Sequence, residues 1–284
     1  MSSGPRYQPY LDVPATPFRW RLGLRPLDLV DWLQLDDEYD TMIERKRQVM
    51  TDHPATAFAV LDDVDAESIE IRDSIVAHLL AIDDPRVDPV DPCLHPLDAA
   101  ARLVQEDLVM MVEREGRLVC GGGSVCFPNR WDLVSKLGRT MTEIHEPVAR
   151  LNEHLEAPID RFFERLTPER SYWRLGWGVL DTDELYQPTD GTAPARPSET
   201  TPAAHHLRVE RETLRRMPRT GCVLFTIRTY LCPLDAVPGP DDALALAEAI
   251  ESMPDDVAEY KQLDRVGSVV SGWLRRAAAE PEDE

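Results

Sequence analysis

The chain has 284 residues, of which 43% are hydrophobic and 29% charged, a composition that supports a substantial folded core. Its 52 Asp and Glu outnumber 31 Lys and Arg, and the formal net charge of −21 disfavours nucleic-acid binding, which requires clustered positive charge. Because no apolar run approaches the roughly 20 residues of a membrane helix and the N-terminus lacks a signal-peptide core, we expect a cytoplasmic protein that binds no membrane.

The N-terminal part of the chain predicts an extended arm followed by helices. Residues 1–25 are rich in proline and aromatic residues, which favours an arm docked across the domain. Hydrophobic spacing predicts helices over residues 27–35, 39–50, 67–82 and 97–104. A short apolar run at 57–61 interrupts them, and four prolines in 83–96 indicate a loop.

The middle of the chain predicts about five β-strands. A hairpin is expected from residue 107 to residue 120, and further strands over 172–180, 206–212 and 223–231. Gly121, Gly122 and Gly123 extend the hairpin, which indicates a bulge or the close approach of another backbone or a ligand.

The remaining segments complete a single-domain interpretation. Residues 187–204 contain four prolines and few large apolar groups, which predicts a mobile loop. Helices are expected over 241–252, 255–263 and 268–279, before a charged tail at 280–284. We therefore expect residues 26–284 to form one α+β domain, with an antiparallel sheet and flanking N- and C-terminal helices.

His145 is the best-placed histidine for ligand chemistry among the seven. It lies between Ile144 and Pro147, a residue suited to the first position of a helix, so we expect the imidazole to project from a rigid element. The alternative is a histidine that only caps or packs at a helix start. The other histidines lie in polar loops, on packed helix faces, or, for the pair at 205–206, without a third ligand nearby.

An arginine cluster precedes the last predicted strand in an otherwise acidic chain. Guanidinium groups hold carboxylates and phosphates through paired hydrogen bonds, so these residues are candidates for binding an anionic ligand or a partner's acidic patch. The alternative is a solvated turn balancing Glu210 and Glu212. The cluster comprises Arg208, Arg211, Arg215, Arg216 and Arg219.

Common catalytic motifs are absent from the sequence. There is no GxSxG elbow, no HExxH, no dinucleotide fingerprint and no GK[ST] ending after the three glycines. The five cysteines are odd in number and form no CxxC pair, so we expect free thiols, mostly buried.

An ordered series of segments resembles the haem-dependent oxidative N-demethylases, the haem-bearing subunit of dimethylamine monooxygenase-like systems. The resemblance extends over residues 10–231 and includes Ile-His-Glu-Pro-Val at 144–148 and Arg-Val-Glu-Arg at 208–211. The other matching segments are residues 105–108, 124–131, 136–138, 161–163, 212–218 and 224–230.

The resemblance implies a PAS-like antiparallel sheet and a monooxygenase that uses haem b. Such an enzyme oxidatively removes a methyl group from a secondary amine with oxygen and releases formaldehyde. Its electrons come from NADPH through separate flavin and iron–sulfur subunits. His145 would be the axial ligand of the haem iron, and Glu210 a counter-charge for an ammonium substrate.

Other residues are assigned cofactor contacts on the same basis. Arg208 and Arg211 are candidates for the haem propionates, and Gly122 for a backbone that passes close to a flat ligand. Because Arg208 and Glu210 alternate onto one face of a strand, they are also expected to be able to pair with each other.

Two departures from the family pattern leave alternatives for the substrate. Residues 173–178 carry glycines where the family is expected to hold a polar side chain, and Arg228, a further candidate cofactor contact, stands where a histidine is expected. A different amine, another haem oxidation, or a non-catalytic haem or small-ligand sensor remain the alternatives.

Overall fold

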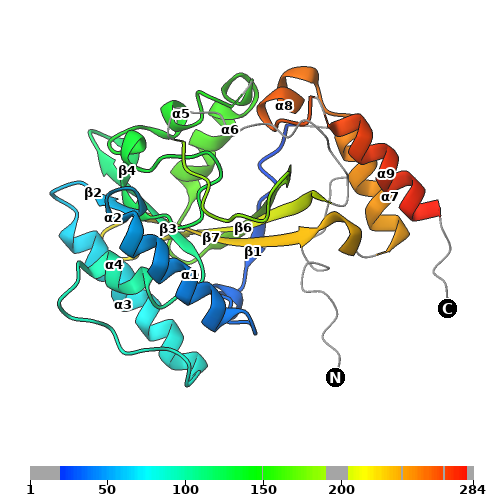
Figure 1. Ribbon diagram of the computed structural model, residues 1–284. Coiled ribbons are helices and arrows are strands. Elements are labelled where there is room, and N and C mark those ends of the chain that lie inside the picture. Colours follow the sequence, from blue (N-terminus) through cyan, green and yellow to red (C-terminus); the bar gives the residue numbers. More distant parts are fainter. Residues whose placement is uncertain (1–19, 149, 190–203, 238, 265, 280–284) are drawn as a thin grey trace.

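The computed structural model describes residues 20–148, 150–189, 204–237, 239–264 and 266–279. Its centre is a seven-stranded antiparallel sheet in the order β1-β5-β6-β7-β3-β4-β2 (Figure 1). The strands are β1 (Arg25–Leu27), β2 (Phe58–Val60), β3 (Asp107–Arg114), β4 (Arg117–Ser124), β5 (Ser171–Leu180), β6 (His206–Arg216) and β7 (Val223–Pro233).

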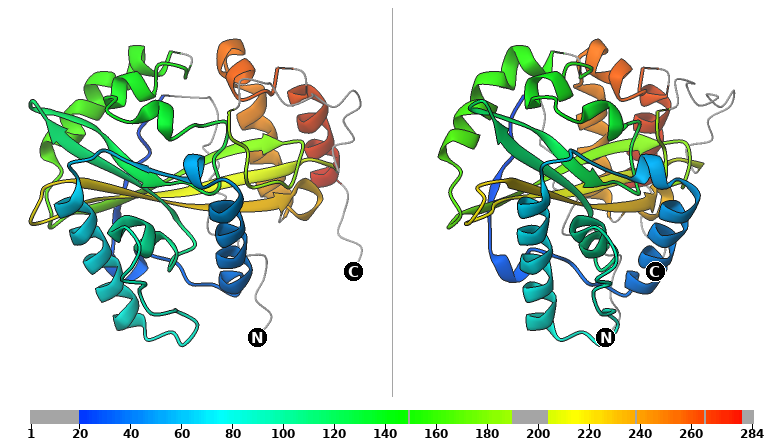
Figure 2. Two further views of the ribbon diagram at one scale, coloured as in Figure 1. Left: turned by 60° about the vertical axis from the view of Figure 1, so that its left-hand side comes forward. Right: turned by 90° about the vertical axis from the view of Figure 1, so that its left-hand side faces the viewer.

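Helices cover both faces of the sheet (Figure 2). One face, here called the α1 face, is covered by α1 (Tyr39–Asp52), α3 (Asp65–Ile82) and α4 (Pro96–Ala101). The opposite face, the α6 face, is covered by α5 (Met141–Ile144), α6 (Leu151–Arg165) and α8 (Asp255–Tyr260). The remaining helical elements are α2 (Pro54–Ala57), η2 (Leu29–Asp31), η3 (Val134–Lys136), η5 (Leu234–Ala236), α7 (Pro240–Glu251) and α9 (Gly267–Ala279).

Apolar side chains divide the interior into three clusters. The first joins α1, α3 and α4 to the sheet, and the second joins α7 and α9 to β6 and β7. The third lies on the α6 face, where Phe163 packs with Leu214 and Val223. Because successive strand residues point to opposite faces, β6 and β7 supply apolar side chains to clusters on both sides. None of the described helices has the length and apolarity of a membrane span.

The three consecutive glycines produce the predicted bulge. The register of β3 and β4 shifts between Met110 and Met111, opposite the glycines. Gly122 has φ +146°, and a Cβ there would lie 2.6 Å from the carbonyl oxygen of Ala59. The close neighbour of this glycine is therefore the backbone of β2, which leaves no room for a flat ligand between them.

The structure confirms the α+β class and the antiparallel sheet, with seven strands where about five were expected. The helix predicted over 27–35 is wrong, because Arg25–Leu27 pairs with the exposed edge of β5 and only the turn η2 follows. Pro147 does not begin a helix either, since α6 begins at Leu151. Residues 1–19 of the arm predicted over 1–25, most of the 187–204 loop and the 280–284 tail lie outside the described residues.

Candidate functional site

His145 ends a single helical turn instead of preceding a helix. Thr140 and Glu143 form a capping box that fixes the start of α5, and His145 is the C-cap residue of the same turn. Its Nδ1 lies 2.9 Å from the carbonyl oxygen of Met141. A carbonyl only accepts hydrogen bonds, so Nδ1 carries the proton and Nε2 keeps its lone pair.

The surroundings of His145 keep its imidazole neutral. Burial lowers the pKa of His145, and the charge of Arg174 lowers it further, whereas the Met141 carbonyl and Glu212 oppose the shift. A neutral imidazole with a bonded Nδ1 and an available Nε2 is the form in which histidine binds a metal ion.

On the α6 face, where His145 also lies, part of strand β5 forms a strip that has no side chains. Arg174, Gly176 and Gly178 alternate onto the α6 face of β5, opposite Glu212, Glu210 and Arg208 of β6. A Cβ added at Gly178 would meet no heavy atom within 4 Å, and the three atoms nearest to one at Gly176 belong to Glu210 and Glu212, the nearest being an oxygen of Glu212 at 3.5 Å. Gly176 and Gly178 therefore form an open, flat surface beside two carboxylates, here called the glycine floor.

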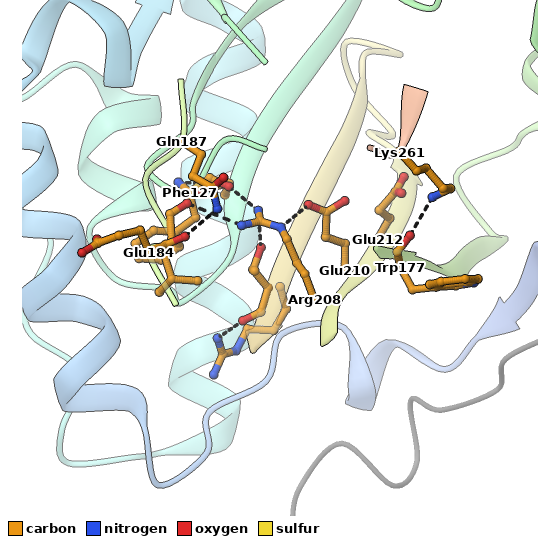
Figure 3. A network of polar contacts seen from close by, with 12 residues as sticks. Phe127, Trp177, Glu184, Gln187, Arg208, Glu210, Glu212 and Lys261 are labelled. Carbon is orange, nitrogen blue, oxygen red and sulfur yellow. Dashed lines mark hydrogen bonds and ion pairs between the residues drawn. The ribbon is translucent and has the colours of Figure 1, made fainter. Parts of the chain in front are cut away.

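Each of these carboxylates has an arginine partner. Arg174 donates to Glu212 through Nε and Nη2, both at 2.9 Å. Arg208 donates through Nε to Oε1 of Glu210 at 2.8 Å, which confirms the expected pairing (Figure 3). The second oxygen of Glu210 points over Gly176, 3.7 Å from the position of an added Cβ.

Arg208 also joins the sheet to two neighbouring loops. Its guanidinium, 1% exposed, donates to the carbonyl oxygens of Phe127 and Leu185 and to the hydroxyl of Thr229 (Figure 3). All four acceptors of Arg208 are protein groups. Arg208 therefore holds Glu210 and the loops that contain Phe127 and Leu185 in place.

Lys261, directly after α8, reaches the edge of the same strip. Its Nζ donates to the carbonyl oxygen of Trp177 at 2.6 Å and lies 5.3 Å from the centre of the Trp177 ring (Figure 3). Burial lowers the pKa of Lys261, the carboxylate of Glu210 raises it, and Arg174 lowers it. Lys261, Glu210 and Arg174 therefore belong to one electrostatic cluster.

The structure separates the residues that the sequence grouped together. His145, Glu210 and Arg208 share the α6 face, whereas Arg211 and Arg228 are cross-strand neighbours on the α1 face. Arg211 donates to the backbone carbonyls of residues 31 and 32. Arg228 is buried and forms ion pairs with the carboxylates of residues 36 and 38. Gly122, against β2, belongs to neither group.

Sequence reasoning missed three charged residues of this site. Arg174 and Glu212 pair across β5 and β6, and Lys261 directly follows α8, about 50 residues farther along the chain. The sequence shows the alternating glycines of β5 only as a departure from the family pattern, although these glycines form the open strip. A matching alternation in β6, with charged residues at 208, 210 and 212, is the signal that identifies the facing strand.

The residues of this strip fit a haem group. A haem site supplies a side-chain ligand for the iron, often a histidine nitrogen, together with space for the flat ring and cationic partners for its carboxylates. On the α6 face, Nε2 of His145 and the open surface at Gly176 and Gly178 would suit the first two features, and Lys261, at the edge of β5, would suit the third.

A family model matches most of the chain. The model described as "Haem-dependent oxidative N-demethylase, alpha subunit-like" matches residues 82–271, which include every residue of the strip. The family name implies haem dependence, an oxygenase-type enzyme and further subunits. With more than half of its length matched, the chain belongs to the family of haem-dependent oxidative N-demethylase, alpha subunit-like proteins.

Proposed function

We propose that this chain is the haem-bearing catalytic subunit of an enzyme that oxidatively removes a methyl group from a small secondary amine and releases formaldehyde. The observation that carries the proposal is His145, a neutral imidazole with Nδ1 bonded to a carbonyl, on the same face as an open glycine floor. When bound, haem b supplies oxygen activation, with electrons from NADPH through separate flavin and iron–sulfur subunits.

In this proposal His145 would hold the haem iron through Nε2. The bond between Nδ1 and the Met141 carbonyl fixes the tautomer and the ring orientation. Because burial lowers the pKa of His145 below the ordinary histidine value of 6.5, the lone pair stays available at neutral pH without any change of protonation.

Glu210 is proposed to bind and orient the amine. Its Oε1 is held by Arg208, and its Oε2 has no partner among the described residues and points over Gly176. An ammonium or amine N–H can donate to Oε2, which places the methyl group above the glycine floor. Arg208 then acts as a positioning residue, because it fixes the carboxylate without facing the open strip.

Replacing Glu210 with Gln is expected to weaken substrate use without changing the haem spectrum. The neutral amide loses the charge that attracts an ammonium group, and a hydrogen bond to a charged partner contributes about 1.5–3 kcal/mol. We therefore expect KM for a secondary amine to rise roughly ten- to a hundredfold. Formaldehyde release, driven by NADPH and a flavin/iron–sulfur reductase, measures the effect.

Glu259→Gln is the matched control, because Glu259 is an exposed carboxylate on α8 and the substitution is identical. The control is expected to keep the wild-type KM. Wild-type chain that binds haem and accepts electrons but releases no formaldehyde from any methylated amine would overturn the enzymatic proposal in favour of a non-catalytic haem protein. An unchanged KM in Glu210→Gln would remove only Glu210 from the substrate site.

A further inference from the structure

The positively charged side chains beside the glycine strip outnumber the carboxylates there. The carboxylate of Glu212 is bonded twice by Arg174, and that of Glu210 is bonded by Arg208. Lys261 is thus a third cation in a cluster with two carboxylates, each of which has its own arginine. A partly buried ammonium group without an exclusive counter-ion is costly, so the cluster favours an additional anion.

The hydrogen bonds of Lys261 point to the same conclusion. An ammonium group has three N–H donors, and among the described residues Lys261 uses one of them, on the Trp177 carbonyl. That carbonyl belongs to the part of β5 beyond Trp173, where β1 no longer pairs with it. The bond to this strand edge uses one N–H donor of Lys261. The other two N–H donors remain available for a ligand.

The position of Lys261 suits a group attached to a flat ligand over the strip. Lys261 is bonded to the carbonyl of Trp177, the residue between Gly176 and Gly178, so its ammonium group lies beside the glycine strip. A ligand that covers this strip is therefore within reach of Lys261. Haem, with a ring that carries two carboxylate side chains, has this geometry and charge.

We propose that Lys261 binds a propionate carboxylate of the haem through its two remaining N–H donors. The inference rests on the proposed function, because it requires haem on the α6 face. It assigns the propionate not to Arg208 or Arg211, which donate to protein acceptors, but to a lysine that has two N–H donors without an acceptor among the described residues. Lys261 becomes a binding residue that connects the C-terminal helices to the cofactor.

The test compares haem with its dimethyl ester, in which both propionates are neutral. Absorbance titration of apo-protein gives the affinity for each porphyrin in the wild-type chain and in Lys261→Met. We expect wild type to bind haem more tightly than the ester, and Lys261→Met to lose roughly tenfold or more of that preference, because a charge-assisted hydrogen bond is removed. Affinity for the ester is expected to stay the same, and Lys261→Arg is expected to restore much of the preference.

Arg275→Met is the matched control, since Arg275 is a half-exposed cation of α9 bonded to Glu251. It is expected to keep the wild-type preference. Equal weakening of haem and ester in Lys261→Met would show a structural role at the β5 edge and overturn the proposal. Loss of preference in Lys136→Met instead would assign the propionate to Lys136, whose charge also affects His145. Wild-type chain that binds neither porphyrin would overturn the proposed function as well.

Discussion

Gly176→Leu is expected to fold and to bind haem roughly ten- to a hundredfold more weakly than wild type. An added Cβ at Gly176 makes only ordinary contacts, 3.5 Å from Glu212 and 3.7 Å from Glu210. The remaining atoms of a leucine side chain extend into the space above the floor, where the ring is proposed to lie. Overfilling a site by this amount typically costs about 1–3 kcal/mol, which gives the expected loss of affinity. Absorbance titration with haem measures it.

Gly176→Ala is the control for Gly176→Leu. It removes the backbone freedom of glycine to a similar extent but adds only one methyl group. Both variants replace a glycine whose φ lies outside the left-handed region, so neither introduces backbone strain. The alanine variant is expected to bind haem with nearly wild-type affinity, and both are expected to keep the wild-type far-UV circular dichroism. Equal haem affinity in the leucine and wild-type chains would show that no ligand occupies the space above Gly176.

Lys46→Met is expected to lower the free energy of unfolding by about 3–5 kcal/mol, the usual cost of removing one partner from a buried ion pair. Lys46 is 1% exposed and donates to the backbone carbonyls of Val104 and Glu106. Its Nζ also lies 4.0 Å from Asp107, which is itself buried. Methionine has a similar volume but leaves this carboxylate and both carbonyls without their cation. Urea denaturation followed by circular dichroism measures the change.

Arg47→Met is the control for Lys46→Met, because it removes a cation from the next residue of the same helix. The ion pairs of Arg47 lie at the surface, where such pairs contribute about 0–1 kcal/mol. A similar loss of stability in both variants would contradict the importance assigned to the buried pair.

The buried pair also connects α1 to the candidate site. Asp107 accepts hydrogen bonds from the backbone N–H groups of Cys126 and Phe127, at 2.9 and 2.8 Å. The carbonyl of Phe127 is in turn an acceptor for Arg208, which holds Glu210. Loss of Lys46 is therefore expected to affect the orientation of the proposed substrate residue as well as stability.

Periodicity predicted most of the elements because their burial follows it. The helix expected over 67–82 is α3, with Ile71 and Ile75 fully buried, and the strand expected over 223–231 is β7. The helix expected over 27–35 is wrong because Leu27, its first residue, ends strand β1, which pairs with β5 about 145 residues farther along the chain. Local pattern contains no information about such pairing.

The site was partly predictable for a similar reason. The motifs make His145 and Glu210 candidates, and their roles stay predictions, whereas alternation predicted the pairing of Arg208 with Glu210 that the structure confirms. The same rule separates Arg211 from Arg208, because residues three apart on a strand point to opposite faces. Lys261 was not predictable, since its place depends on how α8 packs over the edge of β5, which no sequence spacing specifies.

The proposed function depends most directly on His145 as the ligand of the haem iron. The decisive measurement is the absorption spectrum of haem-loaded wild type, His145→Ala and His154→Ala, each recorded with and without added imidazole. His154, an exposed histidine of α6 that stacks on Trp20, is the matched control. We predict that His145→Ala shifts or loses the Soret band, that imidazole restores it, and that His154→Ala keeps the wild-type spectrum. An unchanged spectrum in His145→Ala would contradict the account.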